Sequence, residues 1–119
     1  MVDVFINTNM AEPTLEQVFG TNTTQDATTV TFNKADLIGL TASANNSAES
    51  ILVSLNLTAK EYLTEANFES NIDQRIYYEE RLPSFFNRGE NSLQYRTDQL
   101  TMNLAKVDAD SGINPDNYK

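Results

Sequence analysis

The chain has 119 residues, enough for one domain with a modest hydrophobic core. Its formal charge of −9, from 17 acidic and 8 basic residues, disfavours direct binding to a phosphate backbone. The absence of Cys and His excludes disulfides, thiolate or histidine zinc sites and His-dependent catalytic triads. No apolar stretch approaches the ~20 residues of a membrane span, and the start lacks the basic segment of a signal peptide.

Polar residues that favour turns and strand edges are abundant. Asn occurs 14 times and Thr 13 times, whereas hydrophobic residues make up only 39% of the chain. A small polar domain of this kind often gains stability by oligomerising or by docking on a partner.

Residues 1–28 are predicted to form an N-terminal arm and linker. Two groups of apolar anchors lie along it: Val4, Phe5 and Ile6 near the start, and Leu15, Val18 and Phe19 on one face of a short helical turn. Such anchors need a surface, and a neighbouring subunit can supply one. An ordinary frayed terminus is the alternative interpretation.

Residues 29–107 are predicted to form the compact domain. It begins with a strand in "TTVTFNK", where Val30 and Phe32 share a face. The segment 47–66 fits a strand over eight residues and an amphipathic helix over about twenty, so its length favours a helix. Asn46 and Glu49 are spaced as a capping box at its start. The predicted apolar stripe comprises Ile51, Leu52, Leu55, Ala59, Tyr62, Leu63 and Ala66.

A long hairpin is predicted between about Asp73 and Val107. Its first strand is "DQRIYYEER", which Pro83 ends or demotes to an edge. Its second strand is "SLQYRTDQLTMNLAKVD", whose apolar phase changes near residues 97–99 and so indicates a bulge or bend. Together these patterns predict an α+β fold, in which one central helix packs on a small antiparallel sheet with a long hairpin, plus the extended arm.

The segment "PSFFNRGENS" between these strands is predicted to be a loop. Two consecutive aromatic residues, Phe85 and Phe86, cannot easily enter the same core, and Arg88 follows them. Because aromatic residues and Arg are enriched in interfaces, we expect this loop to contact a partner. A loop folded over the core is the alternative. Further along, Arg96 and Asp98 are spaced on one strand face to form a local ion pair or a pair across a subunit boundary.

The turn-rich C-terminal tail, residues 108–119, contains oxygen ligands of the kind that calcium binds. Its spacing fails as an EF-hand, because Gly112 comes one residue early and Lys119 occupies the twelfth position. A looser site of Asp108, Asp110, Asn114 and Asp116 is the minority hypothesis, and simple turns are favoured. We therefore expect no cofactor, with calcium as the disfavoured alternative.

Paired carboxylates offer the only other hint of catalysis. Glu79 and Glu80 are adjacent, but neighbours on a strand point to opposite faces and cannot converge on one bond. We do not expect an enzyme, and a small carboxylate hydrolase is the least favoured hypothesis.

The chain resembles small virion structural proteins of tailed phages, the capsid cement or decoration type above all. The features that carry the resemblance are the arm-like segment "MVDVFINTNMAEPTLEQVFGTNTTQDATT", the acidic Asn/Thr-rich composition and the hairpin "RIYYEERLPSFFNRGENSLQYRTDQLTMNL". It implies a homo-oligomer on a larger shell or tail protein, made in the host cytoplasm and located in the virion. A small head–tail or tail component and a calcium-dependent extracellular or surface binding module are the alternatives.

Overall fold

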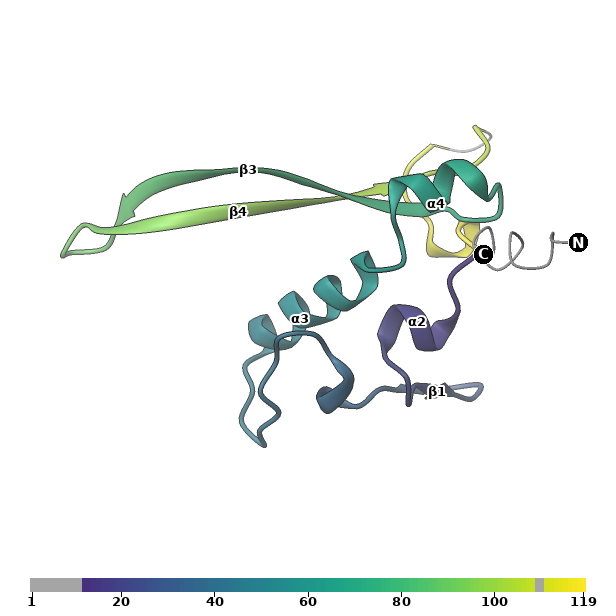
Figure 1. Ribbon diagram of the computed structural model, residues 1–119, viewed down its shortest axis with the longest axis horizontal. Helices are drawn as coiled ribbons and strands as arrows, with labels where there is room; N and C mark the ends of the chain where they lie inside the picture. The colour runs from purple at the N-terminus through teal and green to yellow at the C-terminus, as the bar shows by residue number, and fades with distance from the viewer. Residues whose placement is uncertain (1–11, 109–110) are drawn as a thin grey trace, which may run out of the picture.

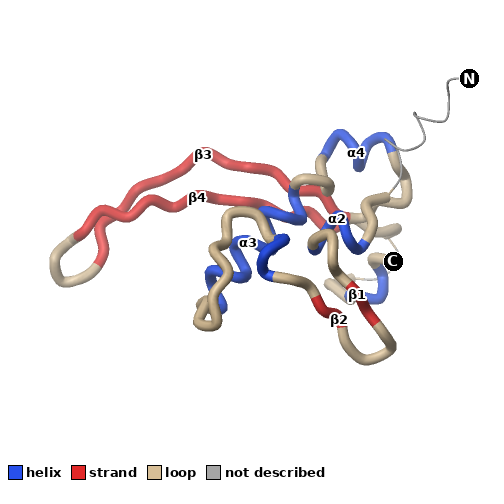
Figure 2. The backbone as a smooth tube through the Cα atoms, turned by 60° about the horizontal axis from the view of Figure 1, so that its bottom comes forward, coloured by secondary structure: helices blue, strands red, loops and turns tan. Residues whose placement is uncertain are grey.

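The computed structural model describes residues 12–108 and 111–119 (Figure 1). The molecule is elongated, with principal extents of 61 × 34 × 33 Å. Its length comes from a hairpin of β3 (Ile76–Arg88) and β4 (Leu93–Leu104), which projects away from the helices in both views (Figures 1 and 2). We call residues 12–75, with 105–108 and 111–119, the body. The predicted α+β class is confirmed, since helices accompany two small antiparallel sheets.

The chain enters the body through the short helix α2 (Leu15–Phe19). Thr14 and Gln17 form a reciprocal capping box at its start, and Gly20 ends it with a φ of 117°. A small hairpin of β1 (Thr24–Gln25) and β2 (Val30–Thr31) follows. The strand expected in "TTVTFNK" is therefore only two residues long. A 3-10 turn, η1 (Lys34–Asp36), leads on towards the main helix.

The main helix is α3 (Ala48–Lys60), which ends earlier than the predicted residue 66. Its N-cap is Ser47, whose hydroxyl accepts from the Ser50 amide at 3.1 Å, so the predicted cap at Asn46 was wrong by one residue. Asn46 instead accepts from the Ser43 amide in the preceding loop. The chain then turns, and Thr64 caps a second helix, α4 (Glu65–Ser70). This second cap is why the long apolar pattern breaks into two helices.

The predicted apolar stripe is buried only in part, at Ala59 and Leu63. Ser54 and Thr58 are the buried side chains of α3 beside Ala59, and both hydroxyls bond the Ile38 backbone. Leu52, which was expected in the stripe, is 59% exposed. The hydrogen bonds of Ser54 and Thr58 to the loop at Ile38 therefore help to orient α3, and the apolar periodicity of the helix does not do so alone.

The base of the long hairpin is joined to the body by backbone hydrogen bonds. The Tyr78 amide donates to the Leu63 carbonyl at 3.0 Å, and the Ala105 amide donates to the Arg75 carbonyl at 2.7 Å. Phe68 of α4 packs on Tyr77 with ring centroids 4.6 Å apart. The base is thus fixed, and the rest of the hairpin extends beyond these contacts.

The hairpin continues through the segment that was predicted to be a loop. β3 runs to Arg88, and only residues 89–92 form the turn. A bulge between Arg81 and Ser84 places Leu82 and Pro83 opposite one residue of β4. The bulge accommodates Pro83, which has no amide for the ladder, so the proline does not end the strand. The phase change expected near residues 97–99 corresponds to this bulge.

The hydrophobic core of the described residues is small. Its buried apolar members are Leu37, Ala59 and Leu63, whereas Thr23, Ser54, Thr58, Asn71 and Gln74 are buried polar residues. The chain exposes 9027 Å² of surface, against about 6,500 Å² for a compact monomer of its mass. This larger area agrees with the many large hydrophobic side chains that stay exposed, Leu82, Val107 and Ile113 among them.

Candidate interaction surface

The distal hairpin, which we define as residues 81–98, carries the exposed aromatic surface. Strand pairing joins Phe86 to Tyr95 and Arg88 to Leu93 across the ladder. Side chains two apart on a strand share a face, so these four residues lie together. We call them the aromatic face.

The aromatic face is ordered by contacts within the hairpin. The rings of Phe86 and Tyr95 stack with centroids 5.7 Å apart and an interplanar angle of 24°. The guanidinium of Arg88 lies 5.7 Å from the Tyr95 ring centroid, within the range of a cation–π contact. Phe86 nevertheless stays 45% exposed and Leu93 61% exposed. The face is thus preorganised and open to a partner.

The opposite side of the distal hairpin carries a second aromatic–arginine pair. The guanidinium of Arg96 lies 6.0 Å from the Phe85 ring centroid, and its Nε donates to Asp98 Oδ1 at 2.8 Å. The ion pair predicted between Arg96 and Asp98 is therefore confirmed. Because Arg96 already has a carboxylate partner, this side is less available for an outside anion than Arg88 is.

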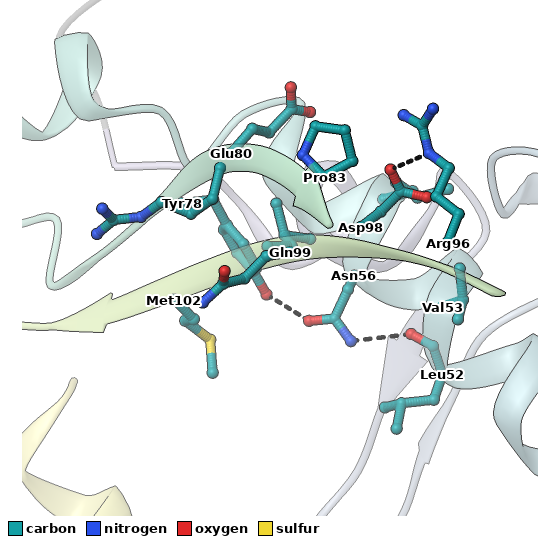
Figure 3. A pocket seen from close by; sticks show the side chains of 13 residues that line it. Leu52, Val53, Asn56, Tyr78, Glu80, Pro83, Arg96, Asp98, Gln99 and Met102 are labelled. Atoms are coloured by element: carbon teal, nitrogen blue, oxygen red, sulfur yellow. Dashed lines mark hydrogen bonds and ion pairs between the residues drawn. The ribbon is translucent and has the colours of Figure 1, made fainter. Parts of the chain in front are cut away.

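An open groove of about 950 Å³ lies between α3 and the hairpin (Figure 3). Leu52, Val53, Asn56 and Leu57 form its helix side. Its hairpin side includes Tyr78, Pro83, Leu100 and Met102. The lining is largely apolar with a few polar groups, so it presents a second unfilled surface beside the aromatic face.

Polar contacts hold the groove at its inner end. The Tyr78 hydroxyl donates to Asn56 Oδ1 at 2.8 Å, as Figure 3 shows. Burial raises the pKa of the Tyr78 phenol, because a buried phenolate would lose solvation. Lys60 of α3 and Glu80 of β3 form an ion pair at 3.1 Å.

The two adjacent carboxylates of β3 lie on opposite faces, as predicted. Glu80 contacts Lys60, whereas Glu79 accepts from Asn103 Nδ2 at 2.9 Å. Arg81 lies 3.8 Å from Glu79. Each carboxylate therefore has a local polar partner, and the two do not face a common point.

The described anchors of the expected arm are part of the body. Leu15, Val18 and Phe19 are half-buried in α2, and the Phe19 ring stacks on Phe32 at a centroid distance of 6.4 Å. The other expected anchors, Val4, Phe5 and Ile6, lie outside the described residues. The contact role of both groups stays a prediction.

The C-terminal tail uses its described polar residues to make turns. The Asn114 side chain accepts from the Asp116 amide and caps the 3-10 turn η2 (Pro115–Asn117). Lys106 Nζ donates to the Gly112 carbonyl at 2.9 Å. Asp108 is exposed, and Asp110 lies outside the described residues. No group of three potential metal-ligating side chains gathers within residues 12–108 and 111–119.

The sequence pattern indicated Phe86 and Arg88 of the aromatic face but not Leu93 and Tyr95, and Phe85, which was also expected to contact a partner, lies on the opposite side. The missing information was the strand register, which pairs Phe86 with Tyr95. Gly89 at the turn, four residues before Leu93, was the sequence signal that could have fixed this register.

Among the described parts of the chain, no helix is long and apolar enough to span a membrane. Comparison of the chain with protein-family models, curated proteins and solved structures gave no match.

Proposed function

We propose that this protein is a non-enzymatic assembly protein of a virus particle, most closely a capsid cement protein of a tailed phage. The observation that carries the proposal is the projecting hairpin with its exposed, preorganised aromatic face. In this proposal the protein forms homo-oligomers and docks on a larger shell or tail protein. Its hairpin provides the contact surface.

The composition of the aromatic face supports a binding role. Its members are Phe86, Arg88, Leu93 and Tyr95, and aromatic residues and Arg dominate the binding energy of protein interfaces. Burying one large apolar side chain contributes about 1.5–3 kcal/mol before ordering costs. The ladder and the ring stack order these side chains in advance, so less conformational entropy is lost on binding.

The small core supports an oligomer or a docked state. Within residues 12–108 and 111–119, the buried apolar residues are Leu37, Ala59 and Leu63, so burial of apolar side chains in this part of a single copy contributes little to its stability. An isolated two-stranded hairpin is at best marginally stable in water, and packing against another element stabilises it. A partner that covers the hairpin supplies that packing.

The assignment to a virus particle rests on the resemblance of the whole chain to small phage structural proteins. A small head–tail or tail component shares that resemblance and fits the same elongated shape. The position of the protein in the particle distinguishes the two. A cement protein decorates the shell, whereas a tail component is confined to the tail or its junction.

Light scattering of the purified protein and of a Phe86→Ala/Tyr95→Ala variant tests the assembly role. The wild-type chain is expected to form oligomers, and the variant is expected to lose them while its circular dichroism still shows a folded body. Electron microscopy of purified particles with a specific antibody tests the virion role. Label on the shell supports the cement role, and particles without the protein contradict a virion role.

A further inference from the structure

We propose that the distal hairpin of one copy docks into an acidic hollow on the body of a second copy, so that copies join head to tail. This inference rests on the proposed assembly function and deepens it by naming the partner. The end of the other copy's hairpin occupies the hollow, with Arg88 of the aromatic face in contact with it.

Charge is unevenly distributed along the molecule. Residues 81–98 contain three arginines and two carboxylates, a net charge of +1. The chain as a whole carries −9, so all the other residues together carry −10. Copies of an acidic body repel one another, whereas the distal hairpin lacks this negative excess. A contact between hairpin and body is therefore electrostatically the most favourable way for two copies to meet.

The hollow is a concave region of about 560 Å³ where α2, η1 and the end of α3 meet. Its lining contains three carboxylates, those of Glu16, Asp36 and Glu61, and no basic side chain. Ile38 is 42% exposed and Tyr62 48% exposed. The hollow thus offers apolar surface for an aromatic ring together with carboxylates for an arginine, the two features that the aromatic face needs in a partner.

Arg88, Glu16 and Glu61 lack strong ion-pair partners within one copy, whereas Asp36 already accepts from the Asn22 backbone amide at 3.2 Å and from Asn22 Nδ2 at 2.9 Å. Among the described residues, no carboxylate forms an ion pair with Arg88, and no basic group does so with Glu16. Glu61 lies 3.8 Å from Lys60, whose closer partner is Glu80. These groups can therefore form charge-assisted hydrogen bonds with a second copy without breaking a strong ion pair.

The geometry requires a second copy. The strands of the long hairpin span ~40 Å, and both views place the turn of this hairpin at the opposite end of the molecule from α2 and β1 (Figures 1 and 2). A hairpin therefore cannot reach the hollow of its own copy. Two different surfaces meet in this contact, so it is heterologous and generates a ring or an open chain of copies.

The response to salt separates this contact from a purely apolar one. Association through Arg88 and the carboxylates of the hollow is expected to weaken about tenfold or more between 0.05 and 0.5 M salt, because salt screens the attraction. Association through apolar surfaces of two acidic copies is expected to strengthen, because salt screens their repulsion. Sedimentation equilibrium over this range measures the dissociation constant, and a strengthening would overturn the proposal.

Charge reversal tests the two surfaces separately and in combination. Arg88→Glu and Glu61→Arg, each in the full chain, are expected to weaken association about tenfold or more. The controls Lys119→Glu and Glu69→Arg change the net charge equally at exposed positions outside both surfaces and are expected to retain association. An equal loss in the controls would overturn the proposal, since net charge alone would then explain the effect.

Mixing the two variants provides the decisive measurement. The Glu61→Arg variant keeps a normal hairpin and the Arg88→Glu variant keeps a normal hollow, so the mixture is expected to associate although each variant alone is weakened. A mixture that remains monomeric while wild type associates would overturn the head-to-tail contact.

The Phe86→Ala/Tyr95→Ala variant separates the failure of this inference from the failure of the assembly function. If that variant loses association but Glu61→Arg does not, the hairpin binds a different surface, so the hollow is excluded and the assembly role stands. If neither variant changes the mass of an oligomeric wild type, both proposals are wrong. A wild type that is monomeric at every concentration overturns the self-docking.

Discussion

The body and the hairpin are stabilised by different kinds of contact. In the body, buried polar side chains such as Ser54, Thr58 and Gln74 bond backbone groups that are distant in sequence. In the distal hairpin, order comes from the strand ladder and from ring and cation–π contacts between cross-strand neighbours. The body thus depends on specific long-range hydrogen bonds, whereas the hairpin depends on local pairing.

This difference separates stability from function in the molecule. A substitution of a buried polar side chain in the body removes hydrogen bonds that water cannot replace in the interior. It is therefore expected to lower the free energy of unfolding. A substitution in the distal hairpin changes a surface that water already reaches, so it is expected to alter association first. Substitutions in the body and in the hairpin test this separation.

Gln74→Ala is expected to have the largest effect on the body. Gln74 is 2% exposed, and its Nε2 donates to the carbonyls of Thr64 at 3.1 Å and Ile76 at 2.8 Å. Its Oε1 accepts from Asn67 at 2.6 Å. The loss of these bonds and the cavity left behind are expected to lower the free energy of unfolding by about 3 kcal/mol, measured by urea denaturation. The exposed control Gln94→Ala is expected to stay within about 0.5 kcal/mol of wild type. Equal decreases in the free energy of unfolding for Gln74→Ala and Gln94→Ala would contradict the difference between body and hairpin.

Thr58→Val is expected to have the next largest effect. The Thr58 hydroxyl accepts from the Ile38 amide at 2.9 Å and donates to the Ser54 carbonyl at 2.8 Å. Valine keeps most of the volume but loses both bonds, so the free energy of unfolding is expected to fall by about 1–2 kcal/mol. The matched change Thr97→Val in the exposed part of β4 serves as the control. A thermal unfolding temperature that drops equally for both variants would show that Thr58 has no special role.

The long hairpin was predictable because its information is local. Alternating apolar residues mark both ends of β4, the change of phase between them marks the bulge, and Gly89 marks the turn, so both strands could be expected from short stretches of sequence. Pro83 indicated the end of the strand, so Phe85 and Phe86 were expected in a loop. This expectation was wrong, because the residues beyond Pro83 pair with β4. The bulge opposite Asp98 is what lets the strand continue.

The orientation of α3 was not predictable from its own sequence. The buried groups Ser54 and Thr58 are polar and bond Ile38, which lies in a separate segment. Apolar periodicity therefore predicted the buried positions Ala59 and Leu63 but wrongly placed Leu52 inside. The acidic hollow could not be predicted from the sequence for the same reason, because Glu16 and Glu61 come together only when α2 packs beside α3.

Tyr78→Phe is expected to have a smaller effect, one that depends on pH. Burial raises the pKa of the Tyr78 phenol above its usual value of 10.0, so the unfolded chain ionises first as the pH rises. The stability from this difference is present below pH ~10 and is lost as the pH rises through the folded pKa. Wild type is therefore expected to lose stability more steeply than the variant between about pH 9 and pH 11.

Denaturant titrations of wild type and Tyr78→Phe at these pH values measure the difference. Near neutral pH the variant lacks only the hydrogen bond to Asn56, whose net contribution is about 1 kcal/mol. Parallel pH dependences for the two proteins would show that Tyr78 does not titrate differently on unfolding.

Phe86→Ala is expected to have the smallest effect on the free energy of unfolding and the clearest effect on the hairpin. The Phe86–Tyr95 stack is a cross-strand pair at a position that is 45% exposed, so its loss costs the hairpin about 0.2–1 kcal/mol. The bonds of Tyr78 to Leu63 and of Ala105 to Arg75 hold the hairpin base independently of this stack. The hairpin can therefore open beyond the bulge while the body stays folded.

Hydrogen exchange of Phe86→Ala is expected to show faster exchange of the amides in residues 84–97 and unchanged exchange in α3. Equal acceleration in α3 would mean that the hairpin and the body unfold as one cooperative unit, and association mutants in the hairpin would then have to be corrected for lost stability.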